Sequence, residues 1–180
     1  MKKLVSRFMA VLMAMTMILS MSMTAFAADA PKGTLTVNNT VAGKTLDLYQ
    51  IFTATKNEAG NVAYTLNSAY EGFFQSKISG ASTLTGEALS EKAYDYVKKQ
   101  VGPDGSNGAE FAKAILGWIL ENDTTVATTH KTATTTDGST VISDLAYGYY
   151  VVYPLGATDT STAPGNETVK SVASLVNVTD

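Results

Sequence analysis

The sequence predicts a mainly β fold: a β-sandwich that carries an insertion of two or three helices between two groups of strands. Segments rich in β-branched and aromatic residues lie toward both ends of the chain, and segments with helical periodicity lie between them. Neither strand group is large enough to close a core alone. We therefore expect one domain in which both groups share a common interior, rather than two domains.

The first 27 residues predict a secretory signal peptide. Basic residues precede a long apolar stretch, and Ala-Phe-Ala at residues 25–27 is typical of a cleavage site. An uncleaved membrane anchor is the alternative, but the apolar stretch is short for a span of ~20 residues. We expect cleavage between Ala27 and Ala28, a domain over residues 28–180, and a secreted, extracellular protein with no membrane contact after cleavage.

Composition excludes several classes of function. The whole chain carries 13 basic and 16 acidic residues, and Lys2, Lys3 and Arg7 belong to the signal peptide. The remaining domain is therefore acidic, which argues against nucleic-acid binding because that function needs clustered basic side chains. The chain has no cysteine. Outside the cell it must therefore depend on its hydrophobic core, or on a crosslink other than a disulfide.

The first strand group contains three predicted strands. Residues 34–37 form a short β segment, and residues 41–44 are a turn. Residues 45–52 carry strong β-propensity with partial alternation of apolar and polar side chains. The turn cluster at residues 57–61 then leads to a strand over residues 62–66, which predicts a hairpin.

Three helices are predicted in the middle of the chain. Residues 70–78 place aromatic side chains on one helical face, and residues 85–101 separate an apolar face from a charged one. Gly102 ends the second helix, and Asn107 has the position of an N-cap for a third helix that ends near Asn122. The residues expected to point inward from the third helix are Phe111, Ala114, Ile115, Trp118 and Ile119.

The second strand group follows a threonine-rich segment. We interpret residues 124–136 as an exposed strand or a long loop, and Asp137-Gly138 as the turn of a hairpin. A strand over residues 141–145 leads to residues 147–153, whose unbroken apolar run predicts burial on both faces. A last strand is expected over residues 169–178.

No residue pattern predicts catalysis, a metal site or a cofactor. His130 is the single histidine and has only threonines and a lysine nearby in the sequence, so we expect an exposed histidine without a catalytic role. The carboxylates show no pairing with a recognisable spacing, and no metal-binding, phosphate-binding or nucleophile motif is present. We therefore expect a protein that is not an enzyme; an exported enzyme is the less favoured alternative.

Four segments together resemble a known family. GKTLDLYQIF at residues 43–52, YTLNSAYEGFF at residues 64–74, LAYGYYVV at residues 145–152 and the end of the chain at residues 171–180 resemble the N-terminal domain of Gram-positive sortase-assembled pilin subunits. The resemblance covers residues 31–180. It implies an immunoglobulin-like β-sandwich in a subunit that a sortase joins head to tail through an isopeptide bond.

The resemblance implies two places where isopeptide bonds form. The lysine that joins such subunits usually follows Tyr-Pro near the end of the domain, but here Tyr153-Pro154 is followed by Leu155. Many such domains also contain an internal Lys–Asn crosslink, for which Asn177 fits the last strand, and Lys32 or Lys44 lies near the first. The alternative is that Asn177 is an ordinary amide at the end of a strand.

The function implied is that of a structural subunit domain in a surface pilus or fimbria, with a role in shaft assembly and cell adhesion. Its partners would be other pilin subunits and a sortase, reached through regions beyond Asp180, and its location would be the cell wall if it belongs to a longer anchored pilin. The alternative is a secreted or surface adhesin-type module that binds a host protein or glycan. An exposed aromatic patch would favour that alternative.

Overall fold

The computed structural model describes residues 31–102, 107–155 and 173–179 of the chain. The predicted signal peptide at residues 1–27 and its cleavage site between Ala27 and Ala28 lie outside these residues. Among the described residues, no helix combines the length and the apolar character that crossing a membrane requires.

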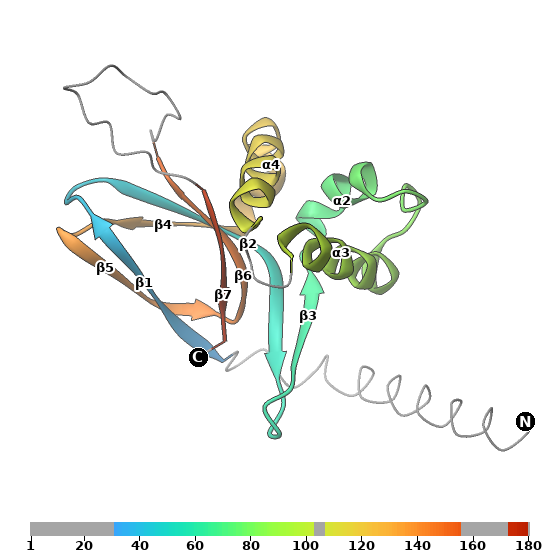
Figure 1. Cartoon of the computed structure of the whole chain (residues 1–180), viewed down its shortest axis with the longest axis horizontal. Helices are drawn as coiled ribbons and strands as arrows, with labels where there is room; N and C mark the ends of the chain where they lie inside the picture. Colours follow the sequence, from blue (N-terminus) through green and yellow to red (C-terminus); the bar gives the residue numbers. More distant parts are fainter. Residues whose placement is uncertain (1–30, 103–106, 156–172, 180) are drawn as a thin grey trace, which may run out of the picture. The chain divides into compact units, whose positions relative to one another are not determined.

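The long strand β2 lies at the centre of a five-stranded antiparallel sheet (Figure 1). Along one edge, β4 pairs with its first half and β3 with its second half, while β6 pairs with the other edge and β7 pairs with β6. The two strand groups therefore pair directly with each other in one sheet. The bounds are β2 Thr45–Lys56, β3 Val62–Leu66, β4 His130–Thr134, β6 Gly148–Pro154 and β7 Ser174–Val178.

Two further strands, β1 (Lys32–Thr40) and β5 (Gly138–Ala146), form a separate antiparallel ribbon. The hairpin predicted at Asp137-Gly138 is wrong, because the strands on either side of this turn enter different sheets: β4 pairs with β2, and β5 pairs with β1. Gly138 does adopt the left-handed backbone of a turn residue, with φ of 78°. The left-handed conformation of Gly138 therefore allows the chain to turn here, but the burial of apolar faces determines which strands pair.

The segment between β3 and β4 is helical within the described residues. The helices predicted over residues 85–101 and 107–122 are confirmed, and Gly102 ends the first of them with φ of 78°. The threonine-rich segment differs from its prediction, because it begins with two short helical turns before β4. The bounds are η1 Ser68–Tyr70, α2 Glu71–Lys77, α3 Gly86–Val101, α4 Gly108–Glu121, α5 Asp123–Val126 and η2 Ala127–Thr129.

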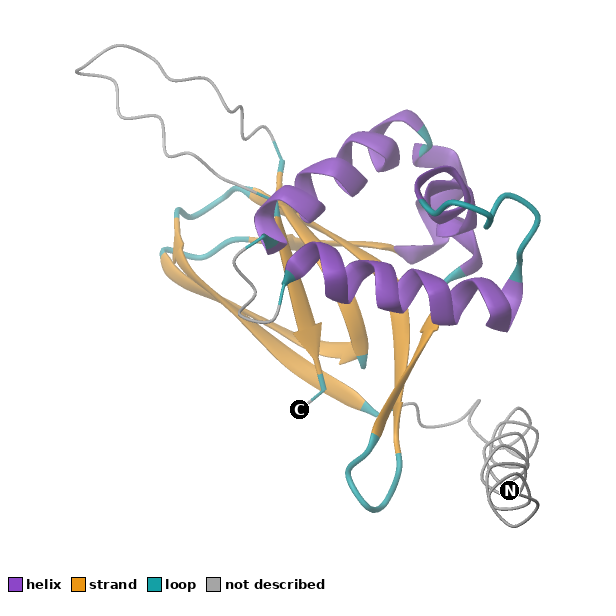
Figure 2. Ribbon diagram, turned by 45° about the vertical axis from the view of Figure 1, so that its right-hand side comes forward, coloured by secondary structure: helices purple, strands orange, loops and turns teal. Residues whose placement is uncertain are grey.

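The helices cover one face of the five-stranded sheet (Figure 2). The β2–β6 register shifts between Gln50 and Phe52, and this irregularity lets both Ile51 and Phe52 face the helices. Trp118 packs against this core, as the sequence predicts. We call this cluster the helix-side core; its fully enclosed members include Ile51, Tyr70, Phe74, Leu89, Ala93, Ile115 and Ile119.

The β1–β5 ribbon covers the opposite face of the sheet. This second cluster, the ribbon-side core, consists of the buried residues Leu46, Leu48, Leu145, Tyr150, Val152 and Val178, with further apolar side chains packed against it. Burial of residues 147–153 on both faces is confirmed, because Tyr150 and Val152 point to the ribbon while Val151 points to the helices. The single interior expected from the sequence is therefore divided in two by the sheet.

Strands β2 and β6 approach each other closely at Gly148. A Cβ atom at this position would lie 2.0 Å from the backbone oxygen of Phe52, so no larger residue fits without moving the strands. The fold is thus mainly β, with curled antiparallel sheets and a helical layer.

Candidate functional site

Two residues singled out by the sequence, Lys32 and Asn177, lie on different layers of the domain. Lys32 begins β1 in the ribbon, and its ammonium group lies 3.8 Å from the carboxylate of Asp144 on the surface. Asn177 lies in β7, opposite Tyr149 of β6, and its amide donates a hydrogen bond of 2.8 Å to the hydroxyl of Tyr64. The amide of Asn177 thus faces the helix-covered side of the sheet, away from Lys32.

The third residue, Lys44, lies at the far end of the sheet from Asn177. Lys44 precedes the first residue of β2, whereas Asn177 is aligned through Tyr149 with Phe52. At ~3.3 Å per residue, this offset along β2 corresponds to about 25 Å. Neither Lys32 nor Lys44 lies near Asn177, so the structure does not support the internal Lys–Asn crosslink.

The backbone around Lys44 is held by one buried threonine. Thr135, which is 5% exposed, accepts hydrogen bonds from the backbone N–H of Gly43 through its carbonyl oxygen and from that of Lys44 through its hydroxyl oxygen, both at 2.9 Å. The N–H of Thr135 in turn donates to the carbonyl of Lys44 at 2.8 Å. Gly43 adopts φ of 76°, which the tight turn before β2 requires. Lys44 is therefore an exposed side chain on a firmly anchored turn.

Apolar side chains lie beside this lysine. The N–H of Leu155, just after β6, donates a hydrogen bond of 2.9 Å to the carbonyl of Thr45. Val41 and Leu155 are 55% and 57% exposed, so both offer apolar surface to solvent. Among the described residues no carboxylate lies within ion-pair distance of the Lys44 ammonium group. We call Val41, Lys44 and Leu155 the Lys44 site.

An apolar groove of about 240 Å³ begins next to this site. Its floor includes Leu46 and Val152, and Pro154 lies at the end near Lys44. Its walls come from β1 and from β7, each of which pairs with one strand only. The groove thus lies between the ribbon and the five-stranded sheet, where β1 and β7 do not pair with each other.

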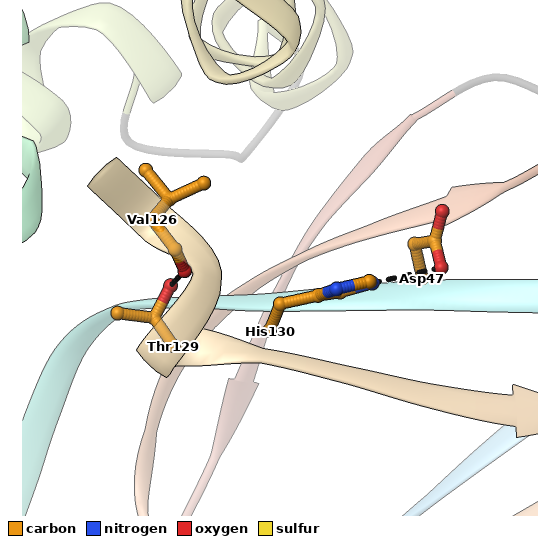
Figure 3. Close-up of polar contacts among 4 residues, drawn as sticks. All are labelled: Asp47, Val126, Thr129 and His130. Carbon is orange, nitrogen blue, oxygen red and sulfur yellow. Dashed lines mark hydrogen bonds and ion pairs between the residues drawn. The ribbon is translucent and has the colours of Figure 1, made fainter. Parts of the chain in front are cut away.

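His130 is not the isolated histidine that the sequence suggested. Its Nε2 lies 2.9 Å from a carboxylate oxygen of Asp47 (Figure 3), and its ring stacks on Tyr49 with centroids 4.6 Å apart. Asp47 is 5% exposed, so this charge lies in the sheet with His130 as its ionisable partner. Burial, followed by the charge of Asp47, raises the pKa of Tyr49 above its ordinary value.

A second polar contact lies next to this pair. The hydroxyl of Thr129 donates 2.8 Å to the carbonyl of Val126 (Figure 3) and is also hydrogen-bonded to the hydroxyl of Tyr70. Burial raises the pKa of Tyr70 well above its ordinary range. These hydroxyls thus join η1 to the helical turns α5 and η2 just before β4, which indicates a structural role.

Sequence reasoning missed Thr135 and Asp47. No local signal marks Thr135, because its partners lie 91 to 94 residues away. Asp47 did carry a signal: it is a charged residue within the apolar run of residues 45–52, and a buried charge needs a partner.

A comparison of the chain with protein-family models and with curated proteins finds no match. Among the described residues, no group of three or more His, Cys, Asp or Glu side chains is placed to hold a metal ion. The chemistry available at the Lys44 site is that of a surface primary amine on a fixed backbone, bordered by apolar contacts.

Proposed function

We propose that this chain is a structural subunit domain of a sortase-assembled surface fibre, exported by its N-terminal signal peptide and built on the plan of an immunoglobulin-like β-sandwich. The observation that carries the proposal is the Lys44 site: an exposed amine on an anchored turn, next to the end of β6. Antiparallel pairing between the early and the late strand group also supports it.

In this proposal Lys44 supplies the amine to which the sortase joins the next subunit. The resemblance places the joining lysine directly after Tyr-Pro, where this chain has Leu155. The hydrogen bond between Leu155 and Thr45 brings that position beside Lys44, so a lysine from a neighbouring strand stands in for the missing one. As a nucleophile, the neutral amine attacks the acyl group that the sortase carries and forms an isopeptide bond, while the sortase is released.

The apolar surroundings fit an acceptor site. Val41 and Leu155 offer exposed apolar area within reach of the amine, which a docking sortase or subunit covers. The anchored backbone keeps the lysine in place while only its side chain moves, which lowers the entropic cost of docking. The adhesin-type alternative is less well supported, because Val41, Leu120, Val141 and Leu155, the exposed large apolar residues of the described chain, include no aromatic.

The test uses the mature chain, a pilus-type sortase and a donor peptide that carries the motif of that sortase. We expect one covalent adduct, located at Lys44 by peptide mapping, and we expect Lys44→Arg to lose at least nine-tenths of it. Arginine keeps the charge and length of the side chain but is not a useful nucleophile.

Lys131→Arg is the matched control, because Lys131 is another exposed lysine of the same sheet and should leave the yield unchanged. An adduct that persists in Lys44→Arg and maps to a different lysine would overturn the assignment of the site. The absence of any adduct on the wild-type chain, with a sortase that processes its own pilin, would overturn the fibre-subunit proposal itself.

A further inference from the structure

Three tyrosines from three different elements meet beside the helix-side core. Tyr64 comes from β3, Tyr94 from α3 and Tyr149 from β6, and all three are half-buried. The ring centroids of Tyr64 and Tyr149 lie 4.8 Å apart, and those of Tyr64 and Tyr94 lie 5.0 Å apart. We call these residues the tyrosine cluster.

The three phenols of the cluster interact with one another and with Asn177. The amide of Asn177 donates a hydrogen bond of 2.8 Å to the hydroxyl of Tyr64, and Tyr64 and Tyr94 both act electrostatically on the phenol of Tyr149. Burial, then its two tyrosine neighbours, raises the pKa of Tyr149 to about 12, which keeps this phenol protonated at neutral pH. Because the ring centroids of Tyr64 and Tyr149 are only 4.8 Å apart, carbon atoms of the two rings lie in van der Waals contact.

We propose that Tyr64 and Tyr149 form an oxidative cross-linking site, at which a peroxidase-type one-electron oxidant acting with hydrogen peroxide joins the two rings as dityrosine. Each phenol loses one electron and one proton, and the two radicals couple through the carbons beside their hydroxyls. The hydrogens on those carbons then move to the oxygens, which restores both rings. The two electrons and two protons released reduce one hydrogen peroxide to two waters.

The third tyrosine is disfavoured as a coupling partner by charge. The ammonium group of Lys98 lies 4.8 Å from the centre of the Tyr94 ring. A positive charge over a ring opposes the removal of an electron from it. Tyr64 and Tyr149 also have the shortest ring separation in the cluster, so the coupling is assigned to this pair.

The bond would join β3 to β6 across the intervening strand β2. It would close a loop that contains the whole helical insertion, from η1 to η2, and closing a long loop lowers the entropy of the unfolded chain. In a chain without cysteine, it would do what a disulfide does in other exported domains. This inference does not depend on the fibre proposal.

The test treats the dilute mature chain with a peroxidase and hydrogen peroxide. We expect dityrosine fluorescence in the monomer, a mass lower by two hydrogen atoms, and a higher midpoint of thermal unfolding. Digestion with trypsin should yield one new cross-linked species that joins residues 57–77 to residues 132–170. Fragmentation should then place the link at Tyr64 and Tyr149.

Tyr64→Phe and Tyr149→Phe each retain the ring and should abolish the product. Tyr96→Phe is the matched control, since Tyr96 is a half-buried tyrosine of α3 outside the cluster, and it should leave the yield unchanged. The proposal is overturned by a link at Tyr94 or elsewhere, by dimers alone, or by no coupling in a reaction that couples free N-acetyltyrosine.

Discussion

The two faces of the five-stranded sheet are built differently. On the helix side, aromatic and aliphatic side chains from the strands and helices enclose one another, and a buried hydroxyl, Ser90 of α3, accepts a hydrogen bond of 2.8 Å from the N–H of Leu66. On the ribbon side, two strands cover the sheet within the part of the chain that the structure describes, and there the groove between β1 and β7 is open.

The two faces therefore differ in how much their side chains contribute to stability and in how accessible those side chains are to another molecule. Enclosed side chains contribute most to the free energy of unfolding, because replacing them leaves a cavity that the surroundings cannot fill. Side chains along an open groove contribute less but remain accessible to another molecule. The Lys44 site lies at the end of this groove, between the ribbon and the five-stranded sheet.

One substitution on each face tests this contrast most directly. We expect Leu89→Ala, in the enclosed helix-side core, to lower the free energy of unfolding by about 3 to 4 kcal/mol. The same change at the half-buried Leu35, which lines the groove, should cost about 1 kcal/mol, because less apolar area is lost from burial. Urea denaturation of both variants and the wild type measures the difference.

Leu145→Ala distinguishes burial from location. Leu145 belongs to the ribbon-side core but is 1% exposed, so its replacement should cost nearly as much as that of Leu89. Equal losses at Leu35 and Leu89 would mean that the groove is closed in solution, and the contrast between the two faces would not hold.

The Asp47–His130 pair gives the next largest expected effect. His130→Ala leaves the buried carboxylate of Asp47 without its ionisable partner and removes the ring stacked on Tyr49. A loss of about 2 kcal/mol is expected, below the cost at a fully buried pair because the side chain of His130 is 32% exposed. Chemical denaturation at neutral pH provides the measurement.

The double variant Asp47→Asn/His130→Ala serves as its control. A neutral amide is less costly to bury than an unpartnered carboxylate, so the double variant should recover part of the loss. If the two single substitutions were simply additive, the contact in Figure 3 would contribute nothing beyond packing.

Local patterns predicted most of the elements and the β2–β3 hairpin, but not the pairing of strands that are distant in the sequence. Alternation over residues 45–52, the apolar run over residues 147–153 and the helical spacing over residues 85–101 all correspond to observed elements. Each pattern indicates the secondary structure of one segment and which of its side chains are exposed. Pairing depends on which apolar faces meet, which is why the turn at Asp137-Gly138 was misread as a hairpin.

Errors of detail have similar causes. Ala114 was expected to point inward but is exposed, whereas Ala112 and Leu116 of the same helix are buried. A small rotation of α4 changes which residues touch the sheet, and no sequence pattern defines that rotation. The contact between Asp47 and His130 joins residues 83 apart, so no local spacing could reveal it.

Two neighbouring tyrosines allow the smallest test of the comparison, since Tyr149 faces the helix side and Tyr150 the ribbon side. Burial raises the pKa of both to about 12, but the neighbours Tyr64 and Tyr94 add to the shift at Tyr149 alone. Because the pKa in the folded state lies above the unfolded value of ~10, each protonated hydroxyl contributes to the free energy of unfolding. This contribution is complete below pH ~10 and is lost as the pH rises toward 12.

Tyr64→Phe should therefore lower the pKa of Tyr149 and leave that of Tyr150 unchanged, because Tyr150 donates its hydrogen bond to the carbonyl of Ala146 instead. The measurement is the ultraviolet titration of tyrosinate, in the wild type and in Tyr64→Phe, each compared with Tyr149→Phe and Tyr150→Phe to assign the two hydroxyls. An equal shift at both positions would show that the two faces of the sheet are electrostatically coupled. The separation of the two cores by β6 would then be one of packing only.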